Sequence, residues 1–292
     1  MIIDSHAHYT HNAFNNTFRY LTHREEGYAI EEGDRVRLLQ ALKDAGITCS
    51  VEPGVSLASC ENVLQISHEH PGHIFPAIGV HPTRAIGEKW SDRRILRKYA
   101  NTPGVVAIGE TGLDYHYKRE EQHRRKQYVW FLYQLDLAWK RKLPVILHVR
   151  DAHEDALRIL RLHPARKLGG VIHCFYGPKE VARQYLKLGY HIGIGGAVLQ
   201  PEERAKDLWE AVAEMPPERI LLETDAPFIL PYCKDVLPPK ILRRTRNTSL
   251  ILPAVAEKVG QIKGIPAADV ERITAENAIR LFGLPVDTEW TN

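Results

Sequence analysis

Apolar residues along the chain gather in eight short runs, and stretches with helical periodicity separate most of them. The runs lie at residues 1–8, 46–54, 74–82, 105–115, 143–151, 170–175, 190–196 and 220–227. The helical stretches cover residues 34–45, 57–70, 92–100, 119–140, 152–162, 179–188 and 202–213, and two more, 250–263 and 267–282, follow the last run. Alternating strand and helix signals are typical of a parallel α/β fold, and eight units favour a closed barrel over an open doubly wound sheet. The pattern therefore predicts a (β/α)8 barrel of the TIM type.

Five of the runs end in side chains that can bind metal ions. They are His6 and His8 after the first run, followed by Glu110, His148, His173 and Asp225. The carboxyl ends of the strands in such a barrel converge on one face, so these side chains can share one site. His6 and His8 can point at one ion, because side chains two apart on a strand share a face.

Each of these residues also has a structural explanation when it is taken singly. A His-x-His pair at a strand end can be a surface or capping feature, and a lone His or Glu after an apolar run is more often structural than a ligand. Five runs that all end in ligand-type residues are difficult to explain by packing. The set indicates a metallohydrolase with its metal site at the carboxyl ends of the strands.

Length and cysteine usage describe the kind of protein. The 292 residues slightly exceed the roughly 250 that are typical of such barrels, and no linker divides them, so we expect a single domain over residues 1–292. The four cysteines, at positions 49, 60, 174 and 233, show no paired spacing, which favours reduced thiols in a cytoplasmic protein over a secreted disulfide framework. No signal peptide is visible, and no apolar run approaches the roughly 20 residues that span a bilayer. We expect no membrane association.

The charge pattern alone does not indicate a nucleic-acid-binding protein, because the net charge is only +3. A basic cluster after the last run could place positive potential near the mouth of the site, or it could be the solvated start of a helix; it consists of Lys240, Arg243, Arg244 and Arg246. The mixed run 118–126 predicts an exposed helix face. The same interpretation applies to Arg93, Arg94, Arg97 and Lys98.

Seven ordered motifs resemble those of the TatD-type metal-dependent deoxyribonucleases. They are Asp-Ser-His-Ala-His at residues 4–8, Gly-Val-His-Pro at 79–82, Gly-Glu-Thr-Gly-Leu-Asp-Tyr at 109–115, His-Val-Arg-Asp-Ala at 148–152, His-Cys-Phe at 173–175, Glu-Thr-Asp-Ala-Pro at 223–227 and Asn-Ala-Ile-Arg-Leu-Phe-Gly at 277–283. The resemblance runs nearly end to end. It implies a TIM barrel of the metal-dependent hydrolase superfamily and hydrolysis of phosphodiester bonds in DNA, of the 3′–5′ exonuclease type. Single-stranded DNA or 3′ ends are then the expected partner, with no obligate protein partner.

The resemblance also implies how two divalent ions are held. One lies among His6, His8, Glu110 and Asp225, and a second lies among Glu110, His148 and His173, with Glu110 as the bridge. Two cations roughly 3.5–4 Å apart can activate a water and stabilise the leaving oxygen of an in-line phosphoryl displacement. Mixed imidazole and carboxylate donors suit zinc, manganese, iron or cobalt, and magnesium can act in turnover.

The sequence suggests roles for two of the residues around the ions. Asp225 is expected to orient and deprotonate the attacking water, because a carboxylate on the metal accepts a proton at short range. Arg150 lies two residues beyond His148 and is expected to bind a non-bridging phosphate oxygen. The alternative for Arg150 is a structural ion pair with Asp151 or Glu110.

Other motif residues keep two interpretations each. His81 is expected to touch the phosphate or a bound water, or else to be a loop residue with a backbone bond. Glu223 either orients a ligand from behind or contacts substrate. Asp114 and Tyr115 can support the turn after Glu110 rather than touch DNA. The remaining histidines lack the strand-end pattern and are expected at the surface or in loops: His11, His23, His68, His70, His73, His116, His123, His153, His163 and His191.

Three departures from the family pattern bear on the substrate. Tyr176 stands where the family often has a Ser, and its phenol could stack on a base or narrow the cleft. Residues 246–249, Arg-Asn-Thr-Ser, keep only the first half of the family's Arg-Asn-Glu-Pro. The segment 10–33 is longer than usual, and could bind single strands by aromatic stacking or cover the site as a lid; its aromatic residues are Phe14, Phe18, Tyr20 and Tyr28.

Two further hypotheses concern the class of protein. Related barrels hydrolyse amides, lactones or other esters, but many of them bridge two metals with a carboxylated Lys where this chain has Glu110, which favours a phosphoesterase. An inactive barrel that only binds nucleic acid or protein predicts lost ligands, whereas all six are present.

Overall fold

Eight parallel strands form one sheet in the order β1-β4-β5-β6-β7-β8-β9-β10. The computed structural model describes residues 1–24, 27–117, 120–233 and 237–286. The strands are β1 (Ile2–Asp4), β4 (Ile47–Pro53), β5 (Ile74–Ile78), β6 (Ala107–Asp114), β7 (Val145–Arg150), β8 (Gly170–Ile172), β9 (His191–Ile194) and β10 (Ile220–Leu222). Each lies within one of the eight apolar runs, so the predicted strands are confirmed.

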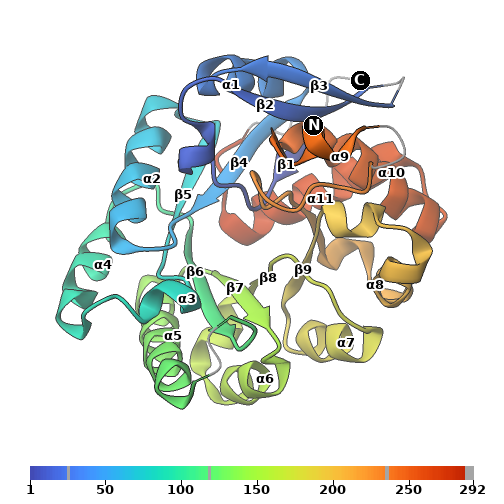
Figure 1. Cartoon of the computed structure of the whole chain (residues 1–292). Coiled ribbons are helices and arrows are strands. Elements are labelled where there is room, and N and C mark those ends of the chain that lie inside the picture. Colours follow the sequence, from blue (N-terminus) through green and yellow to red (C-terminus); the bar gives the residue numbers. More distant parts are fainter. Residues whose placement is uncertain (25–26, 118–119, 234–236, 287–292) are drawn as a thin grey trace.

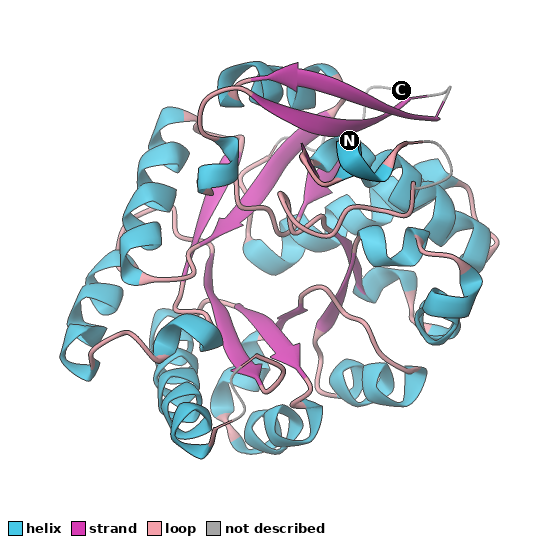
Figure 2. Ribbon diagram, in the orientation of Figure 1, coloured by secondary structure: helices cyan, strands magenta, loops and turns pink. Residues whose placement is uncertain are grey.

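The first and last strands of this sheet meet and nearly close a barrel (Figure 2). Ser5 N donates to Leu222 O over 2.9 Å, and Ala7 forms a parallel bridge with Ala226. These contacts lie beside the candidate ligands His6 and His8, which follow the first strand, and Asp225, which follows the last. The predicted TIM barrel is confirmed.

Helices surround the strands on the outside (Figure 1). They are α1 (Arg35–Asp44), α2 (Leu57–Glu69), α3 (Pro82–Ala85), α4 (Arg93–Tyr99), α5 (Glu121–Arg141), α6 (His153–Leu162), α7 (Lys179–Lys187), α8 (Glu202–Glu214), α9 (Pro239–Leu242), α10 (Leu252–Lys263) and α11 (Ala267–Phe282). The predicted helices are confirmed to within two residues at each described end. Residues 118 and 119, where a mixed-charge helix start was expected, lie outside the described residues.

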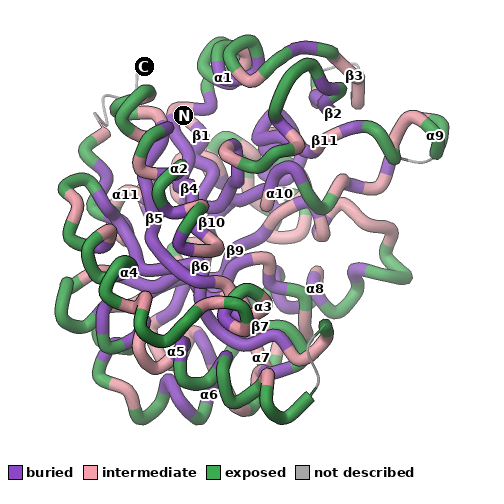
Figure 3. The backbone as a smooth tube through the Cα atoms, turned by 60° about the vertical axis from the view of Figure 1, so that its left-hand side comes forward, coloured by how far each residue is buried: buried purple, intermediate pink, exposed green. Residues whose placement is uncertain are grey.

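The barrel interior is apolar directly beneath the candidate site. Ile146 and Val171 are fully buried and precede His148 and His173 by two residues on the same strand or its extension. Because side chains two apart share a face, each of these apolar residues supports a ligand above it. Phe282 of α11 packs in the same interior cluster, and buried backbone runs through the centre of the molecule in Figure 3.

Two buried glutamines of α5 fix the strand ends that carry candidate residues. Gln127 accepts from Asp114 N at 2.8 Å and donates to Asp114 O at 2.9 Å. Gln134 accepts from Val80 N at 2.7 Å and donates to Val80 O at 3.0 Å. Each amide thus satisfies both backbone groups of a residue next to the site, where no ladder partner would otherwise do so.

The long segment after β1 forms a hairpin instead of an irregular loop. Its strands β2 (Phe18–Arg24) and β3 (Gly27–Gly33) pair antiparallel, and β11 (Thr245–Arg246) adds to β2. Phe14, Phe18 and Tyr20 are buried, with Phe14 only 1% exposed. Stacking of a single strand on these three rings, one of the two roles considered for the segment, is therefore wrong, because the rings are buried and pack on one another. The hairpin lies beside the barrel in Figure 1. Of the described part of the segment, residues 10–12, which precede the hairpin, line the candidate cavity.

No helix within residues 1–24, 27–117, 120–233 and 237–286 is long and apolar enough to cross a membrane. The four cysteines are free thiols.

Candidate metal centre

Glu110, in the middle of β6, lies at the centre of the candidate site and is 3% exposed. Its Oε1 faces three imidazoles: His148 Nδ1 at 3.0 Å, His173 Nε2 at 3.0 Å and His81 Nε2 at 3.2 Å. These histidines come from β7, from the turn after β8 and from the turn after β5, which converge at the carboxyl ends of the strands.

The other oxygen of Glu110 faces a second group of donors. Oε2 lies 3.5 Å from His6 Nε2 and 3.7 Å from His8 Nε2. Those two nitrogens are 3.1 Å apart, and Asp225 Oδ1 lies 3.3 Å from that of His8. Asp225 has a φ of 54°, a left-handed conformation that aspartate and asparagine tolerate better than most residues. One carboxylate thus divides five imidazoles into two groups.

The donor set fits divalent cations. Nitrogen and carboxylate oxygen atoms within each cluster lie within 4.8 Å of one another. The clusters are His6–Glu110–His173, His6–His8–Asp225 and His81–Glu110–His148. Mixed imidazole and carboxylate donors are typical of zinc, manganese and related ions. All six residues predicted as ligands are brought together, and His81 joins them.

Contacts behind the ligands hold two of the imidazoles in place. His148 Nε2 lies 3.0 Å from Asp114 Oδ2, so its Nδ1 is the nitrogen directed at the site. His81 Nδ1 lies 2.8 Å from Thr83 Oγ1, which leaves its Nε2 for the site. Asp114 Oδ1 also accepts from the backbone N–H groups of residues 116 and 117 at 3.0 Å. Asp114 therefore supports the turn, as one interpretation predicted, and also orients a ligand.

Asp4 links the loops that carry His6 and Asp225. It accepts from His6 N at 3.1 Å, Thr224 N at 3.1 Å, Thr224 Oγ1 at 2.5 Å and Ser249 Oγ at 2.6 Å. Asn247 donates to Thr224 O at 3.0 Å from the same side. No sequence motif indicated these roles, although Asn247 and Ser249 belong to the segment that departs from the family pattern.

Glu223 lies behind the ligands. It is fully buried and does not line the cavity. Its Oε1 accepts a hydrogen bond from Cys174 N and lies 3.7 Å from His173 Nδ1. Of the two interpretations of Glu223, direct substrate contact does not agree with this burial, and support of the His173 segment does.

The electrostatics of the site are dominated by burial and by facing charges. Burial alone would raise the pKa of Glu110, but the surrounding imidazoles hold it well below its usual range. Burial alone would lower the pKa of His8, yet the Asp225 and Glu110 carboxylates raise it to about 9. The pKa of His148 rises to about 9 against burial in the same way, through Asp114 and Glu110. The site therefore strongly favours cationic charge next to its carboxylates.

A cavity of about 690 Å³ opens above the donors. His8, Glu110, His148, His173 and Asp225 form part of its wall. Its outer wall includes several side chains that the motifs did not single out: His11, Asn62, Thr83, Arg84 and Phe228. Phe228 is 46% exposed, and its ring lies 5.1 Å from that of His11 in an edge contact.

Two predicted substrate contacts lie outside the cavity wall. Arg150 is exposed at the end of β7, and its guanidinium lies 4.7 Å from the ring centre of Tyr117 and donates to its hydroxyl at 3.1 Å. Asp151 pairs with His116 at 3.0 Å and Glu110 with histidines, and neither of these two carboxylates forms an ion pair with Arg150, so the alternative role of Arg150 is wrong. Tyr176 is 55% exposed and donates its hydroxyl proton to Arg204 O.

The basic cluster after β10 and the histidine at position 191 are further charged or titratable groups for which the sequence made a prediction. Lys240 at the start of α9 and Arg243 and Arg244 just after its end are exposed and do not line the cavity, which agrees with a solvated segment. Arg246, the fourth member of the cluster, lies in β11, is partly buried and donates from Nε to Ala13 O at 3.4 Å. His191 was expected at the surface or in a loop, but it lies in β9 and is 7% exposed, so that prediction is wrong. His191 pairs with the buried Val171 of β8 in the parallel ladder, and its side chain is covered there.

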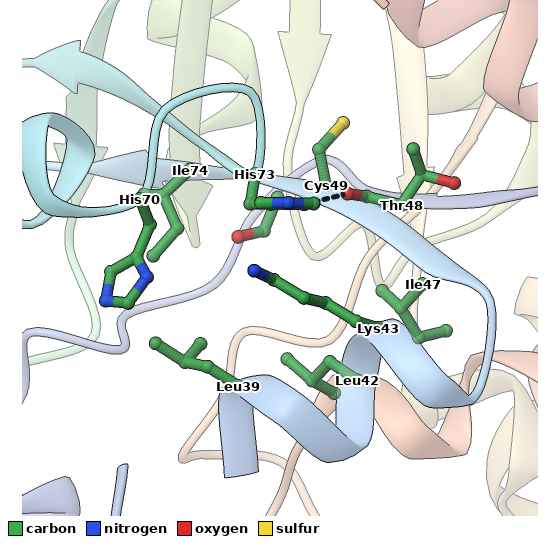
Figure 4. Close-up of a pocket in the computed structure, with 10 residues that line it drawn as sticks. Leu39, Leu42, Lys43, Ile47, Thr48, Cys49, His70, His73 and Ile74 are labelled. Carbon is green, nitrogen blue, oxygen red and sulfur yellow. Dashed lines mark hydrogen bonds between the residues drawn. The ribbon is translucent and has the colours of Figure 1, made fainter. Parts of the chain in front are cut away.

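A second cavity, of about 20 Å³, lies between α1, β4 and the turn before β5 (Figure 4). Leu39, Lys43 and Ile74 form part of its wall, and His73 Nδ1 donates to Thr48 O at 3.0 Å. This volume holds about one water molecule, so it offers no site for a larger ligand.

The barrel and the buried cluster of imidazoles and carboxylates at its carboxyl end define a metal-dependent hydrolase. The chain belongs to the family described as TatD related DNase, whose sequence profile matches residues 3–283. The prediction of this family and of a hydrolase is confirmed.

Individual relatives agree along nearly the whole chain. A Bacillus subtilis protein named uncharacterized metal-dependent hydrolase YabD is 33% identical over 97% of this chain and 99% of its own. The Erwinia tasmaniensis protein named 3′-5′ ssDNA/RNA exonuclease TatD is 35% identical over 86% of this chain and 94% of its own. Among solved structures, the Escherichia coli TatD homologue YJJV superposes with a TM-score of 0.82 and 26% identity, over 97% of this chain and 98% of that one.

Proposed function

We propose that this chain is a divalent-metal-dependent exonuclease that removes nucleotides from the 3′ end of single-stranded DNA. The observation that carries the proposal is the placement of Glu110, whose Oε1 faces His81, His148 and His173 while its Oε2 faces His6 and His8. A carboxylate between two groups of imidazoles is suited to bridge two ions. The relatives named as 3′-5′ ssDNA/RNA exonucleases support this choice of substrate.

Two ions would be held by the residues already described. One would take His6, His8, Glu110 and Asp225, and the other would take Glu110, His148 and His173, with His81 beside it. Such ions supply Lewis acidity and neutralise the charge that develops on a phosphate. The prediction of two ions, with zinc, manganese, magnesium, iron or cobalt as candidates, goes beyond the geometry and belongs to this proposal.

Asp225 is the residue that takes the proton from the attacking water. Its side chain is 16% exposed, more than that of Glu110, and it lies in the cavity wall. Its pKa lies below the usual value, since His8 and the neighbouring imidazoles more than offset the effect of burial. It is therefore ionised and able to accept a proton.

The cavity wall has groups for both parts of a nucleotide. Phe228 presents a half-exposed ring at the edge of the donors, where a base can stack. Arg84 of α3 adds a cation to the same wall, where it can attract a phosphate. Arg150 is exposed at the end of β7, outside that wall, and its predicted contact with a phosphate stays part of the proposal. Tyr176 is not among the proposed contacts, because its hydroxyl donates to Arg204 O of α8. The cytoplasmic location and the absence of an obligate protein partner stay predictions.

The test is cleavage of 5′-end-labelled single-stranded DNA by metal-stripped protein, titrated with magnesium, manganese and zinc. Asp225→Asn is the matched control, because asparagine keeps the side-chain size and tolerates the left-handed backbone of residue 225. A ladder that shortens stepwise, depends on the ion and is absent in the variant is the expected result. Turnover of lactones, amides or simple esters without any cleavage of DNA would contradict the proposal and favour the other hydrolase class.

A further inference from the structure

A third cavity adjoins the one above the donors. It has a volume of about 500 Å³ and lies between the turn after α3 and the first part of α5. Gly87 and Glu88 belong to the walls of both cavities, so the two cavities are neighbours on either side of this turn. In Figure 1, α3, α4 and α5 lie together at this edge of the barrel. A linear ligand that fills the first cavity can continue into this one.

An exposed tryptophan forms part of the wall of the outer cavity. Trp90 is 45% exposed, and its ring makes edge contacts with Trp130 at 5.7 Å and Tyr133 at 5.5 Å. The guanidinium of Arg93 lies 4.8 Å from the ring centre, and Arg93 also donates to Trp90 O at 2.8 Å. These contacts hold the indole in one place, so little conformational entropy is lost when a planar group stacks on it.

The charge around this tryptophan is mainly positive. Lys89, Arg125 and Lys126 line the cavity, and Glu88 is the acidic residue among them. The carboxylate of Glu88 is already engaged, since it accepts from Leu57 N at 3.2 Å at the start of α2. Arg125 pairs with the exposed Glu121 at 2.6 Å, an exchangeable surface ion pair.

More cations continue outward from the cavity along α4. They are Arg94, Arg97 and Lys98, which lie at least partly in solvent. The sequence alone suggested an ordinary solvated helix face here. The structure adds that this basic face follows a tryptophan-lined cavity, which shares Gly87 and Glu88 with the cavity of the candidate metal centre.

We propose that this outer cavity, formed around Trp90 with Lys89, Arg125 and Lys126, is a binding site for the single strand at a distance from the bond that is cut. A base stacks on Trp90, and the basic side chains face the phosphates on either side of it. The combination of a rigid aromatic surface with a basic groove is what single-stranded nucleic acid binds without regard to sequence. The inference rests on the proposed function for the direction of the strand, since the 3′ end lies at the metal centre.

Binding is measured with the full chain carrying Asp225→Asn, so that the strand stays intact. The probe is a labelled oligo(dT) of about 12 nucleotides, a length within the usual site size, and its fluorescence anisotropy gives the Kd. Adding Trp90→Ala is expected to raise the Kd about tenfold, the usual effect of losing one stacked base. The matched control is Trp139→Ala on helix α5, because Trp139 is 42% exposed and precedes Lys140 and Arg141 at the end of that helix far from the cavity. An equal effect of both substitutions, or none of either, would overturn the proposal.

The basic side chains are tested independently of the packing of Trp90. The pair Arg125→Gln and Lys126→Gln is expected to lower the slope of log Kd against log salt concentration by about 1.4, because each lost phosphate contact on a single strand lowers it by about 0.7. The pair Lys140→Gln and Arg141→Gln should leave that slope unchanged. An unchanged slope in the first pair contradicts a phosphate role, even if Trp90→Ala proves unstable.

Chain length separates this inference from the proposed function. The ratio of kcat/KM for the long strand to that for a dinucleotide is expected to fall about tenfold in Trp90→Ala with an intact Asp225. Cleavage with an unchanged ratio leaves the nuclease proposal standing and rejects the outer binding site. Tight binding that depends on Trp90, without any cleavage, rejects the nuclease and supports the binding site.

Discussion

Asp114 Oδ2 lies 3.0 Å from His148 Nε2, on the side of the imidazole opposite to the nitrogen that faces Glu110. The contact fixes which nitrogen of His148 is directed at the candidate ions. A carboxylate behind a histidine ligand also makes the ligand more basic.

Asp114→Asn should weaken binding of one ion while the fold survives. The amide oxygen of the introduced asparagine can still accept from the backbone of residues 116 and 117, whereas its amide nitrogen cannot accept from His148. Loss of such a partner costs roughly 10–100-fold in metal affinity. Isothermal titration of the metal-stripped protein with Zn²⁺ or Mn²⁺ measures the metal affinity of each variant. The control is Asp151→Asn, because Asp151 pairs with His116 at an exposed position. Equal affinities in both variants would reject the role of Asp114.

Gly193 of β9 should tolerate no side chain, because a Cβ there would approach Glu223 Cδ to 2.6 Å. Glu223 cannot move away cheaply, since it is fully buried and holds Cys174 N. Gly193→Ala is expected to destabilise the protein by about 1–3 kcal/mol, the usual cost of overpacking, and to lower turnover by displacing the segment that carries His173.

A double variant tests the reason for this cost. In a Glu223→Ala background the clash is gone, so adding Gly193→Ala should change the free energy of unfolding, measured in urea, by less than about 0.5 kcal/mol. Additive losses would mean that the cost at position 193 has another origin than contact with Glu223.

Ser249 should stabilise the site from a great distance along the chain. Its Oγ donates to Asp4 at 2.6 Å and lies 2.5 Å from Tyr9 Oη, and all three residues are buried. Ser249→Ala leaves two buried polar groups short of a partner, so we expect a loss of roughly 1–3 kcal/mol in unfolding free energy. Ser67→Ala, which removes a bond within α2 at a partly exposed position, should cost less. If the two losses are equal, the network around Asp4 contributes no more than a surface hydroxyl.

The strand ends could be predicted from the sequence, whereas contacts such as that of Ser249 could not. His148 and Glu110 follow apolar runs, and the alternation of runs and helices is a local pattern that the fold preserves. Asp4 and Ser249 are 245 residues apart, and no local pattern connects them. His81 was expected near the phosphate, but its direction toward Glu110 depends on a side-chain contact with Thr83.

The aromatic segment before α1 shows a second property that the sequence could not predict, namely the direction in which side chains point. Phe14, Phe18 and Tyr20 were open to interpretation as a stacking surface, because a sequence shows which rings are present but not which way they face. In the structure Phe14 packs on Phe18 at 5.1 Å, and Phe18 on Tyr20 at 5.8 Å. Trp90, which lay in a segment without any predicted role, and Phe228 are rings that do face solvent at a cavity.

His191 should make the stability of the protein depend on pH below neutrality. Burial, with Arg219 and Arg280 acting in the same direction, lowers its pKa from the ordinary 6.5 to about 4. The unfolded chain therefore binds a proton below about pH 6.5, whereas the folded protein does so only below about pH 4. Between these values the unfolded state takes up more protons, so stability falls as the pH falls, by roughly 2 kcal/mol at about pH 5 for a shift of this size.

Removing the imidazole should remove that part of the pH dependence. His191→Gln keeps a polar side chain of similar size without a titrating group, so the difference in unfolding free energy between about pH 7 and about pH 5 is expected to shrink by roughly 2 kcal/mol relative to the parent protein. Urea unfolding at the two pH values measures this difference, and His68→Gln, at an exposed position of α2, is the control. What matters is the change between the two pH values, because the substitution can also lower stability equally at both. If His191→Gln and the parent protein lose the same free energy of unfolding on acidification, burial of His191 does not cause the acid sensitivity of the protein. The histidines of the candidate metal centre would then be the groups to test.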